Sequence, residues 1–150
     1  MDTASLDDFS RDVAKHLFAQ FPQWQGLAKI ERADDGSGYL RLEVEAPPGS
    51  SAANGLSVTT SYGEMIVGFD YYHGHFGAQI GDGGAESAVR FVVDLVNEKI
   101  PVVSWWEEGE LVAWSTIEDG RPLLPDDLIG QYDRVRIRSW KGTLNVDRDA

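Results

Sequence analysis

Two stretches of the chain carry apolar residues at the three- and four-residue steps of a helix. The first stripe consists of Leu6, Phe9, Val13, Leu17 and Phe21. The second consists of Val89, Val92, Val93, Val96 and Ile100. A stripe with this period is typical of a helix with one buried face. We therefore predict two helices, the first capped by Ser5 and ended by Pro22, the second ended by Pro101.

Short strands account for most of the remaining pattern. Between Tyr39 and Ala46, apolar and charged residues alternate, so that Leu40, Leu42 and Val44 share one side. Such alternation predicts a strand with one buried face. In all, strands are predicted at 27–33, 39–46, 56–60, 64–71, 102–107, 110–117, 132–139 and 143–146.

The predicted elements follow the order helix, four strands, helix, four strands. Because the strands come in hairpin-linked runs and do not alternate with helices, this order favours the α+β class. We expect a mainly antiparallel sheet of about eight short strands with two helices packed on one face. A length of 150 residues suits one domain, so residues 1–150 are expected to form a single α+β domain.

A tryptophan-rich hairpin is predicted around a turn at Glu108 and Gly109. A two-residue turn gives the pairs Glu107–Glu110, Trp106–Leu111, Trp105–Val112 and Val103–Trp114. Val103, Trp105, Val112 and Trp114 then form a core face. If nothing covers the other face, Trp106 and Leu111 form an exposed apolar patch, which is typical of an interface. The two facing glutamates form a binding position for a lysine or arginine of a partner.

The chain is strongly acidic and contains no cysteine. Lys and Arg number 13 and Asp and Glu number 25, for a net charge of −12. Such a charge repels phosphate backbones, so we expect no nucleic-acid binding, and it favours fast capture of a basic partner. Without cysteine, disulfides and thiolate zinc sites are excluded. Residues 1–8 lack the basic start of a secretory signal, and no apolar run reaches ~18 residues; we expect a cytoplasmic protein that does not bind membranes.

A basic stripe contrasts with this acidity. Arg134, Arg136 and Arg138 alternate with apolar residues and so project from one face of a strand. Such a stripe could bind RNA or a carboxylate, although the net charge of −12 disfavours nucleic acid. We expect instead that neighbouring acids neutralise the arginines, with Glu43, Glu45, Glu118 and Asp119 as candidates. The acidic residues themselves gather at helix starts, loops and hairpin ends, where they are exposed. They form either a general solvated surface or an anionic surface that matches a basic partner.

The segment 70–77 carries the residues best suited to metal binding. Asp70, His73 and His75 could ligate zinc, since His-x-His on a strand points both rings to one side. The only other histidine is His16, on the first helix. Aromatic packing, with the ring nitrogens bonded to backbone, is the alternative. We expect no metal and no cofactor, and we assign no catalytic residue because the nucleophile motif G-x-S-x-G is absent. A small metal-dependent enzyme centred on these three residues is the second hypothesis.

One stretch, from Leu56 to Phe76, has the pattern of a known family. A strand ending in Val67, Gly68 and Phe69 is followed by an aromatic-His-x-His-Phe segment formed by Tyr72, His73, His75 and Phe76. This arrangement, with the preceding hairpin at Gly63 and Glu64, resembles bacterial immunity proteins, which protect a cell from its own polymorphic or contact-dependent toxins. Gly74 departs from the pattern, because the relatives more often carry threonine there.

The resemblance implies a non-enzymatic protein that binds one cognate toxin, often a basic nuclease, and occludes its active site or an adjacent surface. An acidic, cysteine-free domain suits such a role, because opposite charge accelerates encounter. We therefore expect a basic toxin as partner, and leave the oligomeric state open. The expected partner-binding residues are Tyr72, His73, His75, Trp106, Glu107, Glu108 and Glu110.

Overall fold

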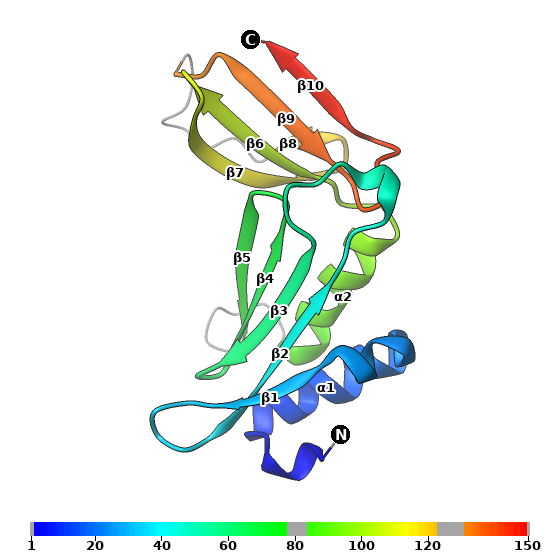
Figure 1. Cartoon of the computed structure of the whole chain (residues 1–150), viewed down its shortest axis with the longest axis vertical. Helices are drawn as coiled ribbons and strands as arrows, with labels where there is room; N and C mark the ends of the chain where they lie inside the picture. The colour runs from blue at the N-terminus through cyan, green and yellow to red at the C-terminus, as the bar shows by residue number, and fades with distance from the viewer. Residues whose placement is uncertain (1, 78–83, 123–130, 150) are drawn as a thin grey trace. The chain divides into compact units, whose positions relative to one another are not determined.

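The chain forms two longer helices and two antiparallel sheets (Figure 1). The computed structural model describes residues 2–77, 84–122 and 131–149. The chain divides into two compact units, one comprising Met1–Glu45, Leu56–Val67 and Gly74–Val93, the other Ala46–Gly55, Gly68–His73 and Asp94–Ala150. Since the chain passes between the units several times, they are not consecutive domains, and the single domain over residues 1–150 stays a prediction.

The first helix, α1 (Asp8–Gln20), starts later than the sequence suggested. Its N-cap is Asp7, whose carboxylate accepts a hydrogen bond from the Ser10 amide at 2.7 Å. The prediction that Ser5 caps the helix is wrong, because Ser5 ends the short 3-10 helix η1 (Thr3–Ser5). An aspartate at the N-cap satisfies an amide that the helix itself leaves unpaired.

The predicted apolar stripe of the first helix is confirmed in part, because Leu6 and Phe21 lie outside α1 and Phe9 is only half-buried. Val13 and Leu17 of the apolar stripe are fully buried. The helix ends before Pro22, which begins the 3-10 helix η2 (Pro22–Leu27), because proline is favoured at the first position of a helix. A third 3-10 helix, η3 (Pro48–Ser50), follows later in the chain.

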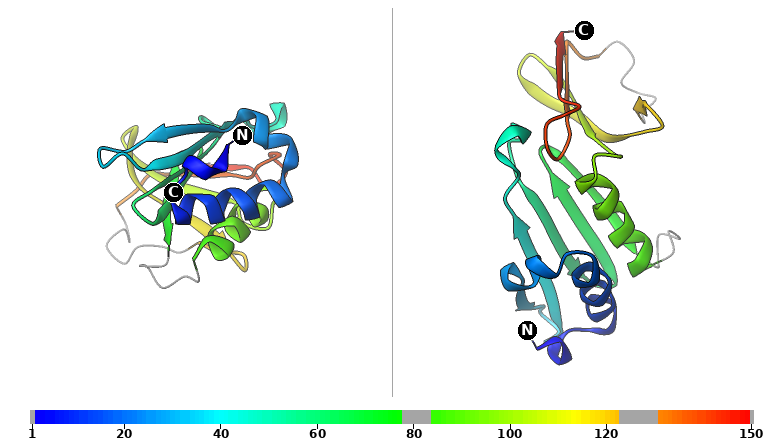
Figure 2. Two further views of the ribbon diagram at one scale, coloured as in Figure 1. Left: turned by 90° about the horizontal axis from the view of Figure 1, so that it is seen from below. Right: turned by 90° about the vertical axis from the view of Figure 1, so that its right-hand side faces the viewer.

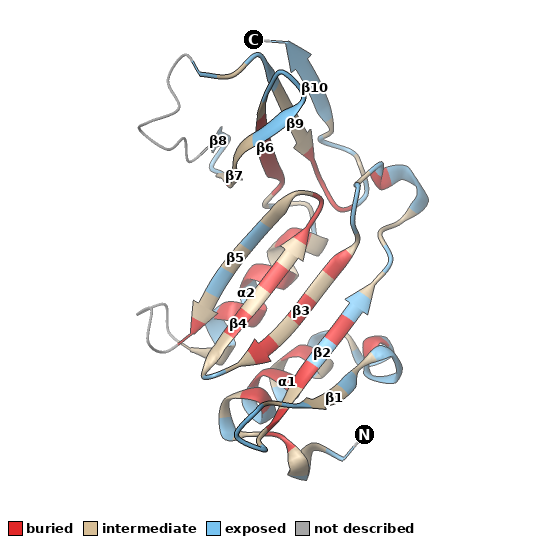
Figure 3. Cartoon of the chain, turned by 60° about the vertical axis from the view of Figure 1, so that its left-hand side comes forward, coloured by how far each residue is buried: buried red, intermediate tan, exposed pale blue. Residues whose placement is uncertain are grey.

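A five-stranded sheet accounts for most of the first unit. In spatial order its strands are β1 (Lys29–Arg32), β2 (Gly38–Val44), β3 (Leu56–Ser61), β4 (Glu64–Phe69) and β5 (Tyr72–Gly77). Burial alternates along β2, β3 and β4, and Leu40, Val58 and Val67 on the inner face are fully buried. Both helices lie on that face (Figures 2 and 3). This sheet therefore agrees with two predictions: strands with one buried face, and two helices packed on that face.

The second helix, α2 (Ala85–Val96), ends before Ile100 of the predicted stripe, so the prediction that Pro101 ends this helix is wrong. Val89 and Val92 are buried as expected. Leu95 and Phe91, which are not part of the predicted stripe, are buried as well, whereas Val93 and Val96 are half-buried. No helix in the described part of the chain is long and apolar enough to cross a membrane.

The second sheet lies wholly within the second unit. Its strands are β6 (Val102–Glu107), β7 (Glu110–Glu118), β8 (Arg121–Pro122), β9 (Arg134–Arg138) and β10 (Val146–Asp149). The spatial order is β10-β9-β6-β7, with the two-residue β8 paired to the outer edge of β7. The fold class α+β is thus confirmed, whereas the expected single sheet of about eight strands is wrong, because the described residues form ten strands in two sheets. Periodicity specifies local hairpins, but it does not specify which strand edges join.

The tryptophan hairpin matches its prediction only near the turn. Glu108 and Gly109 both have positive φ, 50° and 82°, as a type I′ turn requires. The pairs Glu107–Glu110 and Trp106–Leu111 are confirmed. Beyond them a β-bulge shifts the register, so the observed pairs are Trp105–Ala113, Ser104–Trp114 and Val103–Ser115. The predicted partners of Trp105 and Val103 are therefore wrong, because one extra residue in β7 transfers Trp114 to the opposite face.

Candidate partner-binding site

The two faces of the second sheet have different chemistry. On one face, Val103 and Trp105 are buried and pack against Val135 and Ile137 of β9. The three arginines of β9 alternate with these apolar residues and lie on the other face, opposite Trp106, Ser104 and Val102 of β6. The candidate site is built on this second face.

A buried ion pair connects β9 to the turn between β4 and β5. The Asp70 carboxylate accepts hydrogen bonds from Arg136 Nε at 3.2 Å and from Arg136 Nη2 at 3.1 Å. The side chain of Asp70 is only 2% exposed and that of Arg136 is 15% exposed. Arg136 Nη2 also donates to the carbonyl of Ser51 at 2.9 Å. With both carboxylate oxygens and the guanidinium engaged, this pair is a structural clamp within the second unit.

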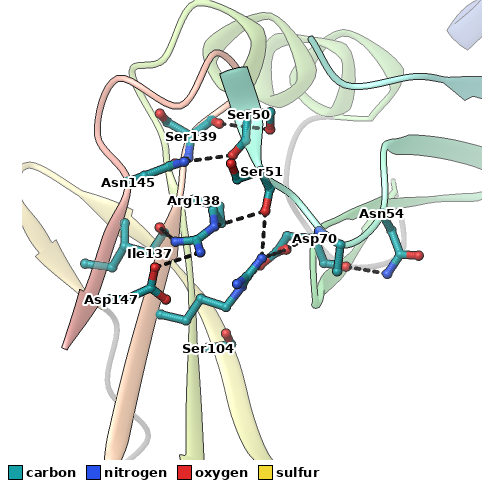
Figure 4. Close-up of polar contacts among 12 residues, drawn as sticks. Ser50, Ser51, Asn54, Asp70, Ser104, Ile137, Arg138, Ser139, Asn145 and Asp147 are labelled. Carbon is teal, nitrogen blue, oxygen red and sulfur yellow. Dashed lines mark hydrogen bonds and ion pairs between the residues drawn. The ribbon is translucent and has the colours of Figure 1, made fainter. Parts of the chain in front are cut away.

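The backbone around Asp70 is held as firmly as its side chain. Its φ is 55°, a left-handed conformation that aspartate tolerates better than most residues. The Asp70 amide donates to the Asn54 carbonyl at 3.0 Å, and the Asn54 side chain donates to the Asp70 carbonyl at 2.9 Å (Figure 4). The Ala53 amide adds a third bond, to Asp70 Oδ1 at 2.7 Å. The turn and the loop of residues 46–55 are thereby joined.

The other two arginines share one carboxylate on β10. Asp147 accepts from Arg138 at 2.8 Å (Figure 4). It also accepts from Arg134 at 3.1 Å. Burial alone would raise the pKa of the Asp147 carboxyl, but these hydrogen bonds outweigh burial and lower that pKa. The arginines are neutralised by acids, as the sequence suggested. The acids observed to pair with them are Asp70 and Asp147, and not the candidates on the other strands and turns.

Aromatic rings lie beside this network. The rings of Tyr71 and Trp106 meet edge to face, with centroids 4.7 Å apart. The Arg136 guanidinium lies 5.5 Å from the centre of the Tyr71 ring, a cation–π distance. The Trp106 indole donates to the hydroxyl of Ser104 at 2.9 Å, which fixes the orientation of the indole. Trp106 is half-buried, so part of its ring remains available for contact.

A pocket opens among these side chains. Its volume is about 250 Å³, and it is lined by Tyr71, Trp106, Gly109, Asp133, Arg134 and Arg136. All six residues belong to the second unit. The pocket therefore combines aromatic surface, two arginines that already have partners, and one exposed carboxylate.

The glutamates predicted to bind a partner lie on the turn next to the pocket. Glu107, Glu108 and Glu110 are all exposed. The Glu108 amide donates to the carboxylate of Asp133 at 2.9 Å, and the Asp133 amide donates to the Trp106 carbonyl at 2.9 Å. These bonds join the acidic turn to the segment that precedes β9. Four of the seven predicted partner-binding residues thus lie in or next to the pocket: Trp106, Glu107, Glu108 and Glu110.

The remaining three predicted residues lie on β5 and do not line this pocket. Tyr72 is partly buried, which together with the charge of Glu118 raises its pKa to about 12. The His73 ring lies 4.8 Å from that of Trp114, and the His73 carbonyl accepts from the Trp114 indole at 2.9 Å. His75 belongs to the first unit, where Nδ1 is 3.0 Å from Glu64 Oε1. The aromatic packing considered for this segment therefore describes His73.

The residues considered for metal binding do not converge. Asp70 directs both carboxylate oxygens to Arg136, whereas His73 packs on Trp114 and His75 meets Glu64. Among the described residues, no group of three His, Cys, Asp or Glu side chains is arranged to hold a metal ion.

Of the six residues that line the pocket, the predicted contact residues include only Trp106; the other five are Tyr71, Gly109, Asp133, Arg134 and Arg136. The alternation of arginines in β9 placed two of them on one face. The close approach of Tyr71 to Trp106 depends on tertiary folding, because 35 positions separate the two residues in the sequence.

Three comparisons with known proteins add no relative. No protein-family model, no curated protein and no solved structure matches the chain.

Proposed function

We propose that this chain is a non-enzymatic acidic binding protein, an immunity protein that neutralises a cognate basic toxin by occluding it. The observation that carries the proposal is the pocket of the second unit, where Tyr71 and Trp106 lie next to an exposed acidic turn. Aromatic anchors surrounded by charged residues are typical of protein-binding surfaces.

The charge of the chain supports a basic partner. With a net charge of −12, the protein attracts cationic surfaces over distances of the order of the ~8 Å Debye length at physiological salt. Opposite charge raises association rates above the ~10⁵–10⁶ M⁻¹s⁻¹ of neutral pairs. The aromatic contacts then slow dissociation, because buried aromatic rings carry a large share of binding energy at interfaces.

The engagement of the polar groups favours binding over catalysis. The side chain of Asp70, the carboxylate considered for metal chemistry, is 2% exposed and bonded to Arg136 and Ala53. A carboxylate held in this way is unsuited to ligate an incoming metal or to act as a general base without breaking the clamp. We therefore favour the binding protein over the metal-dependent enzyme centred on Asp70, His73 and His75.

The assignment to a toxin system draws on the stretch from Leu56 to Phe76, which resembles immunity proteins. This stretch forms β3, β4 and most of β5. Its last turn contributes Asp70 to the clamp and Tyr71 to the pocket. The segment that resembles the family thus supplies residues to the candidate surface.

Co-expression tests the proposal. The product of the neighbouring reading frame is expressed in a bacterial host with and without this chain. We expect the product alone to stop growth and co-expression to restore growth, with the two proteins purifying as a complex whose association rate falls with added salt. A non-toxic product, or toxicity that co-expression leaves unrelieved, contradicts the proposal.

A further inference from the structure

We infer that the pocket between Tyr71 and Trp106 receives an arginine side chain of a basic partner protein. The inference rests on the proposed function, and it specifies the chemistry that the binding surface recognises. The volume of about 250 Å³ lies below the ~300–1,000 Å³ of sites that enclose drug-sized ligands. A single long side chain fits such a volume better than a small-molecule substrate does.

The two arginines that line the pocket do not make it an anion site. Arg136 is bonded to both carboxylate oxygens of Asp70 and to the Ser51 carbonyl. Arg134 is paired with Asp147 at 3.1 Å. Because each guanidinium already has a carboxylate partner, an incoming anion would compete with an existing ion pair.

The uncompensated charge at the pocket is negative. Asp133 lines the pocket, and its carboxylate accepts a hydrogen bond from the neutral backbone amide of Glu108 rather than from a cationic group. Glu107, Glu108 and Glu110 are exposed on the adjoining turn. Because Arg134 and Arg138 share Asp147, the three arginines of β9 keep one positive charge beyond their two carboxylate partners. Asp133 and the three exposed glutamates of the turn outnumber that charge, so acid exceeds base at the mouth of the pocket, which gives charge complementarity to a cationic side chain.

The aromatic walls favour arginine over lysine. A guanidinium is planar, stacks on indole and phenol rings and is more weakly hydrated than an ammonium group. Its planar fork can also donate two parallel hydrogen bonds to the Asp133 carboxylate. Trp106, oriented by its bond to Ser104, supplies a preset ring against which the methylene groups of the arginine can pack.

A titration with Nα-acetylargininamide tests the inference, followed by the NMR signals of the Trp106 indole N–H and the Gly109 amide. We expect saturable shifts with a dissociation constant on the order of 1–10 mM, and at least fivefold weaker binding of the neutral isostere Nα-acetylcitrullinamide. Equal binding of the citrulline compound overturns the inference. So does preferential binding of the α-amide of Nα-acetylglutamate, whose side chain carries a carboxylate, because it would make the pocket an anion site.

Two variants sharpen the test. Asp133→Asn keeps an acceptor for the Glu108 amide but removes the charge, and should weaken binding of Nα-acetylargininamide about fivefold or more. Asp119→Asn, on the exposed turn between β7 and β8, removes the same charge away from the pocket lining and should leave binding unchanged. Equal effects of the two variants contradict a specific role for Asp133.

The outcome is separable from that of the proposed function. If the chain relieves toxicity but Nα-acetylargininamide does not bind, the pocket inference fails while the proposed function stands. If the probe binds the pocket but co-expression does not relieve toxicity, the immunity role fails while the specificity for arginine stands.

Discussion

Asp70 and Arg136 form a two-point ion pair, at 3.1 and 3.2 Å, between positions 66 residues apart in the chain. The pair connects the turn after β4 to β9 within the second unit. Both side chains are largely removed from solvent, with 2% and 15% exposed. Removing one member of such a pair is costly, because the other charge is left buried without compensation.

Replacing Asp70 by asparagine should therefore destabilise the protein. Asparagine tolerates the left-handed backbone at this position and retains an acceptor for the Ala53 amide. The loss of stability therefore reports the removal of the negative charge alone. We expect Asp70→Asn to lower the free energy of unfolding by about 3 kcal/mol, measured by urea denaturation.

Asp119 offers a matched control for this substitution. It also has positive φ, 52°, but it is exposed on the turn between β7 and β8. Asp119→Asn should change the free energy of unfolding by less than about 0.5 kcal/mol. Similar losses for both variants would mean that the buried pair adds nothing beyond an ordinary surface aspartate.

The second unit should lose stability at acid pH because the carboxylate of Glu98 becomes protonated. Burial would raise the pKa of this carboxyl, but hydrogen bonds from the Thr143 side chain, the Ser139 hydroxyl and backbone amides outweigh burial and lower the pKa. The Ser139 hydroxyl and the Lys141 amide donate to Glu98 Oε1 at 2.8 and 2.7 Å. A lowered pKa in the folded state stabilises the protein above the unfolded pKa of 4.5, and that contribution is lost as pH falls through the folded pKa.

Glu98→Gln tests this pH dependence. The glutamine can still accept hydrogen bonds but carries no charge, so the variant should be less stable at pH 7 by about 1 kcal/mol, a difference that narrows below about pH 4. The measurement is urea denaturation at a series of pH values. Glu45→Gln, at an exposed position, should follow the wild-type profile throughout. A difference for Glu98→Gln that stays constant with pH would contradict the role of the carboxylate charge.

Local features of the fold were predictable from sequence because their causes are local. The turns at Tyr62–Gly63 and Glu108–Gly109 have positive φ at both positions, as the residue–glycine pairs indicated. The alternation at Leu40 and Leu42 matches the buried face of β2. In each case neighbouring residues alone determine the conformation.

Features that depend on distant contacts were not predictable in the same way. The strand β5 was missed, because the glycines and histidines of Tyr72–Gly77 lack apolar alternation. The bulge in β7 reversed the face of Trp114, and no turn residue marks it. The candidate site shows the same limit. Its acidic turn follows from sequence, whereas the approach of Tyr71 to Trp106 requires the tertiary fold.

The two faces of the tryptophan hairpin should differ in their contribution to stability. Trp105 is 2% exposed and packs in the core of the second unit, whereas Leu111 is 36% exposed. We expect Trp105→Ala to cost about 3–5 kcal/mol in urea denaturation and Leu111→Ala less than about 0.5 kcal/mol. If Trp105→Ala does not fold, Val103→Ala should still show a loss of about 2 kcal/mol. Comparable losses at Val103 and Leu111 would contradict the assignment of the core face.

Gly142 should tolerate no side chain, because the backbone leaves no room for one. Its φ is 87°, and an added Cβ would run into the carbonyl of Gly49 in the loop that precedes β3. Gly120 has a similar φ, 73°, but nothing lies within 4 Å of the Cβ position. Gly120→Ala should therefore cost about 1 kcal/mol from backbone strain alone, and Gly142→Ala about 2–4 kcal/mol because the collision adds to the strain. Thermal and urea unfolding of the two variants measures the difference. Equal losses would show that the loop at Gly49 moves away without cost, and that its approach to the turn before β10 does not stabilise the second unit.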